Sequence, residues 1–94
     1  MDKKTEEFYT RLKEELANTS AWPSEYLYKF IVPTTLENVM EVENTFNNMG
    51  AVIKTHQSKT GKFTSISINV TMENPEKVVE KYLQVSNIEG IISF

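Results

Sequence analysis

The sequence predicts an α+β fold, a ferredoxin-like βαββαβ sandwich in which a four-stranded antiparallel sheet carries two helices on one face. An extra N-terminal helix precedes this unit. Three observations support the prediction. Apolar and polar residues alternate over residues 65–72, as in a strand with one buried face. Residues 26–32 are rich in aromatic and β-branched side chains and apolar at nearly every position, which favours a central strand covered on both sides. Segments with apolar residues at helical spacing separate the strands.

Length and composition limit the possible functions. The 94 residues are enough for one domain, which we divide into a helix and linker (1–20) and the ferredoxin-like domain (21–94). The chain has no cysteine and one histidine, which excludes disulfides, thiolate metal sites and His clusters, and we expect no cofactor. The net charge of −3 argues against a general nucleic-acid binder. No apolar run is long enough for a membrane span, so we expect a cytoplasmic protein, and a bacterial origin would fit.

The N-terminal segment, residues 5–18, has the pattern of an amphipathic helix with Thr5 as its N-cap. Phe8, Leu12 and Leu16 recur at a spacing of four residues and share one face. A single thin apolar stripe does not stabilise an isolated helix of this length. We therefore expect the helix to dock on its own domain or on a second copy, or else to fray.

The two later helices have start and stop signals. Thr34 and Glu37 have the spacing of a capping box, and Gly50 stands where a helix commonly ends. Asn74 followed by Pro75 predicts the start of the last helix. The inner face of the first of these helices is predicted to consist of Val39, Val42, Phe46 and Met49, with Leu36 and Met40 adjoining. A short strand over residues 90–94 ends the chain.

Residues 51–72 read as a hairpin around the turn Ser58-Lys59-Thr60-Gly61. Its alternation predicts that Ile53 faces Ile68 across the hairpin on the side covered by helices. The opposite, open side then contains Leu27, Lys29, Ile31, Val52, Lys54, His56, Ser58, Phe63, Ser65, Ser67, Asn69 and Thr71. This side is too apolar to be merely solvated. We expect either the N-terminal helix or a second subunit to cover it.

The candidate interaction surface lies on and beside this open side. It comprises Lys29, Lys54, His56, Lys59, Lys62, Phe63 and Ser65. The basic residues suit an anion or an acidic partner, although lysines on exposed strands also serve simply to prevent edge pairing. His56 and Ser65 have no assigned carboxylate or activating base, so we expect no catalytic or metal site. Polar residues after Gly61-Lys62-Phe63 argue against an RNA-recognition domain.

Two segments resemble the YbeD-like family of small bacterial proteins. Tyr28-Lys29-Phe30-Ile31-Val32 is similar to the first strand of that family, and Ser58-Lys59-Thr60-Gly61-Lys62-Phe63-Thr64-Ser65-Ile66-Ser67-Ile68 is similar to its hairpin. The resemblance implies a ferredoxin-like fold related to the amino-acid-binding ACT domains, and no established catalytic activity. Pro33-Thr34 departs from the glycine turn that suits ligand binding in ACT domains.

These observations predict a non-enzymatic regulatory or protein-interaction module that acts through the open side of the sheet. Its partner is an unknown protein, and a homodimer is possible. The alternative is an ACT-like sensor that binds a small molecule, such as an amino acid, at a dimer interface.

Overall fold

The computed structural model describes residues 3–93. Its elements are α1 (Lys3–Thr19), β1 (Ser24–Pro33), α2 (Leu36–Thr45), β2 (Val52–Gln57), β3 (Phe63–Met72), α3 (Pro75–Val85) and β4 (Ile92–Ser93). This order confirms the predicted α+β fold with a βαββαβ unit and an added N-terminal helix. Phe94, which the predicted final strand included, lies outside the described residues.

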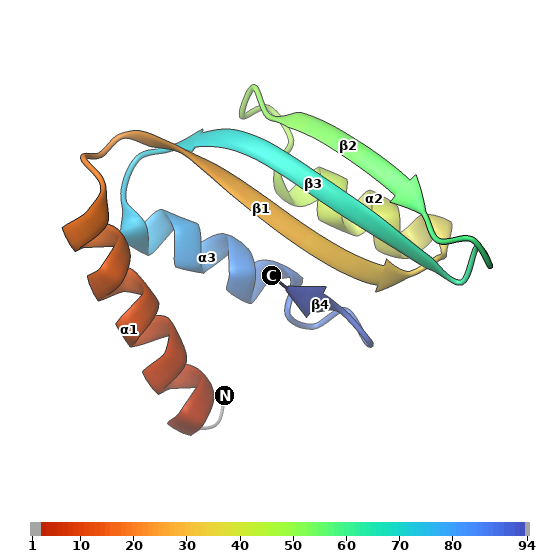
Figure 1. Ribbon diagram of the computed structural model, residues 1–94, viewed down its shortest axis with the longest axis horizontal. Coiled ribbons are helices and arrows are strands. Elements are labelled where there is room, and N and C mark those ends of the chain that lie inside the picture. Colours follow the sequence, from red (N-terminus) through yellow and green to blue (C-terminus); the bar gives the residue numbers. More distant parts are fainter. Residues whose placement is uncertain (1–2, 94) are drawn as a thin grey trace.

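The four strands form one antiparallel sheet in the order β2-β3-β1-β4. The long strands β1 and β3 pair from Ser24 with Met72 to Pro33 with Phe63, and α2 and α3 lie on the same side of the sheet (Figure 1). Ile53 pairs with Ile68 across the hairpin, as its alternation predicted. The strand β1 is central, but only one of its faces is covered.

The core lies between the sheet and the helices α2 and α3. Tyr28, Phe30 and Val32 of β1 are fully buried there. Six rings make up what we call the aromatic cluster: Tyr9, Tyr26, Tyr28, Phe30, Phe46 and Tyr82. The Tyr28 hydroxyl donates a hydrogen bond of 2.9 Å to the carbonyl of Val78, so this buried polar group is satisfied.

The helix ends show which capping predictions hold. Asn74 caps α3 as predicted, because its Oδ1 accepts a hydrogen bond of 2.9 Å from the Lys77 N–H. The prediction for α2 was wrong by one residue: Thr35, not Thr34, is the N-cap and accepts from the Asn38 N–H. The hydroxyl of Thr34 instead makes a hydrogen bond of 2.7 Å with that of buried Thr64. Helix α2 also ends earlier than predicted, at Thr45, and residues 46–50 form turns.

Helix α1 packs beside α3 on the helical side of the sheet (Figure 1). Tyr9, Leu12 and Leu16 contact the core there, and the ring centroids of Tyr9 and Tyr82 are 6.1 Å apart. Trp22 fixes the linker by donating from Nε1 to the Leu16 carbonyl at 3.0 Å. The helix therefore docks on its own domain and does not cover the open side of the sheet.

Two details of the predicted α1 helix are wrong. The helix already includes Lys3 and Lys4, so Thr5 is not its N-cap. Phe8 was assigned to the docking stripe, yet 61% of its surface is exposed. Tyr9 takes its place against the core.

Deleting residues 1–20 is expected to lower the free energy of unfolding by about 2–4 kcal/mol, because Tyr9, Leu12 and Leu16 lose their partial burial. For a domain of this size the melting temperature then falls by roughly 10–20 °C. Thermal unfolding followed by circular dichroism measures the difference. The exposed Phe8 gives the control, since Phe8→Ser should leave the melting temperature nearly unchanged. An equally stable truncated chain would show that α1 contributes nothing to the core.

Candidate interaction surface

Within residues 3–93, no element covers the side of the sheet opposite the helices. We call this surface the open sheet face, and its residues include Glu25, Leu27, Lys29, Ile31, Val52, Lys54, His56, Phe63, Ser65, Ser67, Asn69, Thr71 and Ile92. Leu27, Val52, Phe63 and Ile92 are four of the seven large apolar side chains classed as exposed in the described chain. Apolar exposure concentrated on one face is typical of a surface that binds something.

Strand pairing sets the open sheet face out in rows. At one end, Val52 and Leu27 flank Asn69. Further along the strands, His56, Ser65, Ile31 and Ile92 form a row across all four strands, which ends at the edge strand β4. The apolar residues therefore form two groups, one toward each end of the face.

The middle row contains two lysines. Lys54 and Lys29 flank Ser67 on adjacent strands, so their Cα atoms are about 10 Å apart. Among residues 3–93, neither lysine has a carboxylate within ion-pair distance. Two unpaired ammonium groups between apolar neighbours are suited to a partner that supplies carboxylates.

Charge is unevenly divided between the strands and α2. The four strands and the β2–β3 turn contain four of the ten basic residues but only Glu25 of the thirteen acidic ones. Within α2 the opposite holds, since Glu37, Glu41 and Glu43 are its only charged residues. The open sheet face is thus locally basic in a protein with a net charge of −3.

The turn between β2 and β3 carries the remaining predicted basic residues. Lys59 and Lys62 are exposed in this turn and lie beyond the end of the open sheet face. Ser58 fixes the turn, because its carbonyl accepts from the Gly61 N–H at 2.9 Å and its hydroxyl accepts from the Phe63 N–H at 3.2 Å. Gly61 has a φ of 73°, a left-handed conformation that glycine adopts without strain.

His56 and Ser65 both lie on the open sheet face, as predicted, and they are directly opposite each other. The Ser65 hydroxyl donates a hydrogen bond of 3.2 Å to the backbone carbonyl of His56, not to its ring. A nucleophilic serine needs a base that accepts its proton, and a carbonyl oxygen does not serve as one. Within residues 3–93, no group of three His, Asp or Glu side chains is arranged to hold a metal ion.

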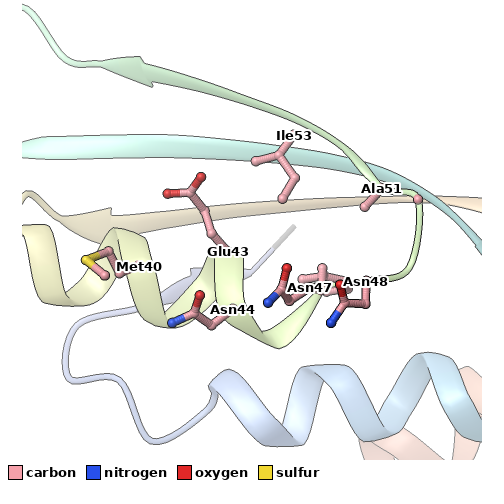
Figure 2. A pocket seen from close by; sticks show the side chains of 9 residues that line it. Met40, Glu43, Asn44, Asn47, Asn48, Ala51 and Ile53 are labelled. Atoms are coloured by element: carbon pink, nitrogen blue, oxygen red, sulfur yellow. The ribbon is translucent and has the colours of Figure 1, made fainter.

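A hollow of about 370 Å³ lies on the other side of the sheet, between α2 and β2. Figure 2 shows Met40, Glu43 and Asn44 of α2 on one side of it and Ile53 of β2 on the other. Its further lining residues are Phe46, Asn47, Asn48, Gly50 and Ala51. Because α2 leaves β2 poorly covered, Ile53 is only half-buried and Thr55 is exposed.

The structure brings five of the seven predicted surface residues together: Lys29, Lys54, His56, Phe63 and Ser65. Sequence reasoning missed Ile92, because a strand of two residues has no period from which to read its parity. It also placed Leu36 and Met40 beside the inner stripe of their helix. Both are exposed, by 75% and 48%. Their i, i+4 spacing was the available signal that they share one flank of α2.

A protein-family model matches most of the chain. Residues 18–94 match the model of a family described as "Protein of unknown function (DUF493)". The match begins at the end of α1 and covers every strand. The comparisons with curated proteins and with solved structures returned no match. Among the described helices, none combines the length and the apolar character that crossing a membrane requires.

Proposed function

The chain belongs to the DUF493 family of proteins of unknown function, and from this premise we propose that it is a cytoplasmic, non-catalytic interaction module. Its open sheet face binds a protein partner that presents apolar and acidic groups. The segment at residues 58–68 supports placing the chain with the YbeD-like proteins of bacteria. A regulatory role would follow from the identity of the partner.

One observation carries this proposal. Apolar side chains and unpaired lysines share a single sheet face that no part of the described chain covers. Burying Leu27, Val52 and Phe63 against a partner removes apolar surface from water. Lys29 and Lys54 would select a partner that places carboxylates between the apolar contacts, because they would repel a partner with basic groups there.

Reversing the charge of the lysine row, by Lys29→Glu with Lys54→Glu, is expected to abolish partner binding. The physical reason is that the new carboxylates would face those of the partner. Affinity capture with wild type and variant as baits, quantified by mass spectrometry, measures the loss. The matched control is Lys4→Glu with Arg11→Glu, which changes the net charge equally on the exposed side of α1. A partner captured equally well by the lysine-row variant would contradict the proposal.

The hollow between α2 and β2 supports a second candidate, the small-molecule sensor. Its volume of about 370 Å³ lies within the range of ligand sites, and Asn44, Asn47 and Asn48 supply donors and acceptors. None of its lining residues is basic, so an amino-acid carboxylate would bind to amides alone. A thermal-shift screen with the amino acids tests this candidate. One specific stabilisation favours the sensor, and a flat response contradicts it.

A further inference from the structure

We infer that the open sheet face binds a second copy of this chain, and that it does so head to tail. The contact on the second copy is the exposed flank of α2, which contains Leu36, Met40, Glu37 and Glu41. We call this surface the α2 flank. The inference rests on the proposed function, because it uses the same open sheet face and names what occupies it.

Exposed apolar side chains mark both surfaces. Besides the four on the open sheet face, the described chain has three large apolar residues classed as exposed: Leu36, Met40 and Phe8. Leu36 and Met40 are one helical turn apart and lie beside the edge strand β2, since hollows lined by them also include Gln57 and Ile53. The chain therefore has two separate apolar surfaces, so the open sheet face of one copy can pack against the α2 flank of another.

Charge makes these two surfaces complementary. The α2 flank carries Glu37 and Glu41, and the helix contains no basic residue. The open sheet face carries Lys29 and Lys54, and its one carboxylate, Glu25, is four residues from Lys29 along β1, beyond Leu27. None of these four interaction residues forms an ion pair within residues 3–93. The lysines of one copy can therefore pair with the glutamates of the next copy across the contact.

The same charges disfavour a two-fold dimer. Packing two open sheet faces together would set Lys29 and Lys54 against the same lysines of the second copy. Pairing two β2 edges would instead bring two acidic α2 flanks together, because this flank borders β2. Both arrangements place like charges in contact, whereas the head-to-tail arrangement joins unlike charges.

The exposed area of the chain is large enough for such a contact. Its accessible surface is 6462 Å². A folded monomer of its mass of 10.8 kDa is expected to expose about 5,500 Å². The chain thus exposes more surface than an average monomer of its mass, and each partner in an interface of standard size contributes roughly 800 Å².

A head-to-tail contact leaves each molecule in a pair with one unused surface. The first keeps a free α2 flank and the second a free open sheet face. Further copies therefore add until the assembly closes into a ring or grows as a filament. The wild-type protein is accordingly expected to show an average mass that rises with concentration.

Two variants separate the two halves of the contact. Lys29→Glu with Lys54→Glu disables the open sheet face, and Leu36→Lys with Met40→Lys disables the α2 flank. Both latter positions are exposed, so lysine fits there without disturbing the core. Each variant alone is expected to remain at the monomer mass in multi-angle light scattering up to millimolar concentration. The control variant, Lys4→Glu with Arg11→Glu, is expected to associate like wild type.

Mixing the two variants is the decisive experiment. The first still has an intact α2 flank and the second an intact open sheet face, so an equal mixture is expected to double the monomer mass and to grow no further. A mixture that stays monomeric while wild type associates would overturn the head-to-tail contact. A wild type that stays monomeric throughout would overturn it too. Neither of these results by itself contradicts the proposed function. The proposed function would be contradicted only if the lysine-row variant still captured another protein as well as the wild type does.

Discussion

Replacing Tyr82 by alanine is expected to lower the free energy of unfolding by about 3–5 kcal/mol, the cost of deleting a large buried aromatic side chain. Tyr82 stands at the centre of the aromatic cluster. Its ring centroid lies 5.0 Å from that of Tyr28 and 5.8 Å from that of Phe30. The same ring contacts Tyr9, so the substitution also weakens the docking of α1.

The size of this effect is severe for a chain of 94 residues, whose whole stability is expected to be about 5–14 kcal/mol. Urea unfolding followed by circular dichroism measures it. The control is Tyr82→Phe, which keeps the ring and removes only the hydroxyl that makes a hydrogen bond of 2.8 Å with Tyr26. That variant should lose about 1 kcal/mol. If alanine cost no more than phenylalanine, the ring would not be a packing centre.

Raising the pH above about 10 is expected to destabilise the fold steeply through its buried tyrosines. Burial raises the pKa of Tyr28 far above its ordinary value, and the nearby Tyr26 adds to the shift. Burial likewise raises the pKa of Tyr82, with the hydrogen bond to Tyr26 as a further cause. These side chains stay protonated in the folded protein at pH values where the unfolded chain ionises.

The direction of the effect follows from proton binding. Above about pH 10 the unfolded chain binds fewer protons than the folded one, so the free energy of unfolding falls as pH rises. Each of the two tyrosines contributes at most about 1.4 kcal/mol per pH unit. Below the ordinary tyrosine pKa their contribution is constant.

Urea unfolding at several pH values between about 9 and about 11 measures this slope, and the ultraviolet absorbance of tyrosinate shows when the rings ionise. The control is Tyr28→Phe, which retains the packing but removes one ionisable group. Its slope above about pH 10 should be shallower than that of wild type, by at most about 1.4 kcal/mol per pH unit. Stability that stays level up to about pH 11 would mean that the buried hydroxyls reach solvent without unfolding.

The sheet was predictable because its pattern is local and repetitive. The alternation from Ser65 to Met72 predicts which residues of β3 face the helices. Pairing across the hairpin then predicts which residues of β2 face the same way. The open sheet face followed directly. Its residues Lys29, Lys54 and Phe63 lie where the alternation placed them.

Other features depend on contacts that no local pattern contains. The stripe containing Leu12 and Leu16 predicts an amphipathic helix, but it does not say that α3 is the surface on which α1 docks. Thr34 and Thr35 are chemically equivalent caps. The choice between them depends on where the chain leaves β1 and on the contact between Thr34 and Thr64.

The exposure of the α2 flank is also a feature that the local sequence pattern does not predict. Apolar residues at helical spacing normally indicate burial, and Leu36 and Met40 fit that pattern. They are exposed because the helix leaves the edge strand β2 partly uncovered, as the hollow between Met40 and Ile53 shows. The relative placement of a helix and a strand is a property of the assembled core.

The division of charge gives the molecule an electric dipole moment directed across its sheet. The strands and the β2–β3 turn carry four basic residues and one acidic residue, whereas the helices carry six basic and nine acidic ones, so a negatively charged object exerts a torque that turns the open sheet face toward it. The molecule turns in this way even though the negatively charged object repels it as a whole, because the net charge of the chain is −3. The torque acts within the Debye length, about 10 Å at 0.1 M salt, so the chain meets an anionic surface already oriented at low salt and with random orientation at high salt.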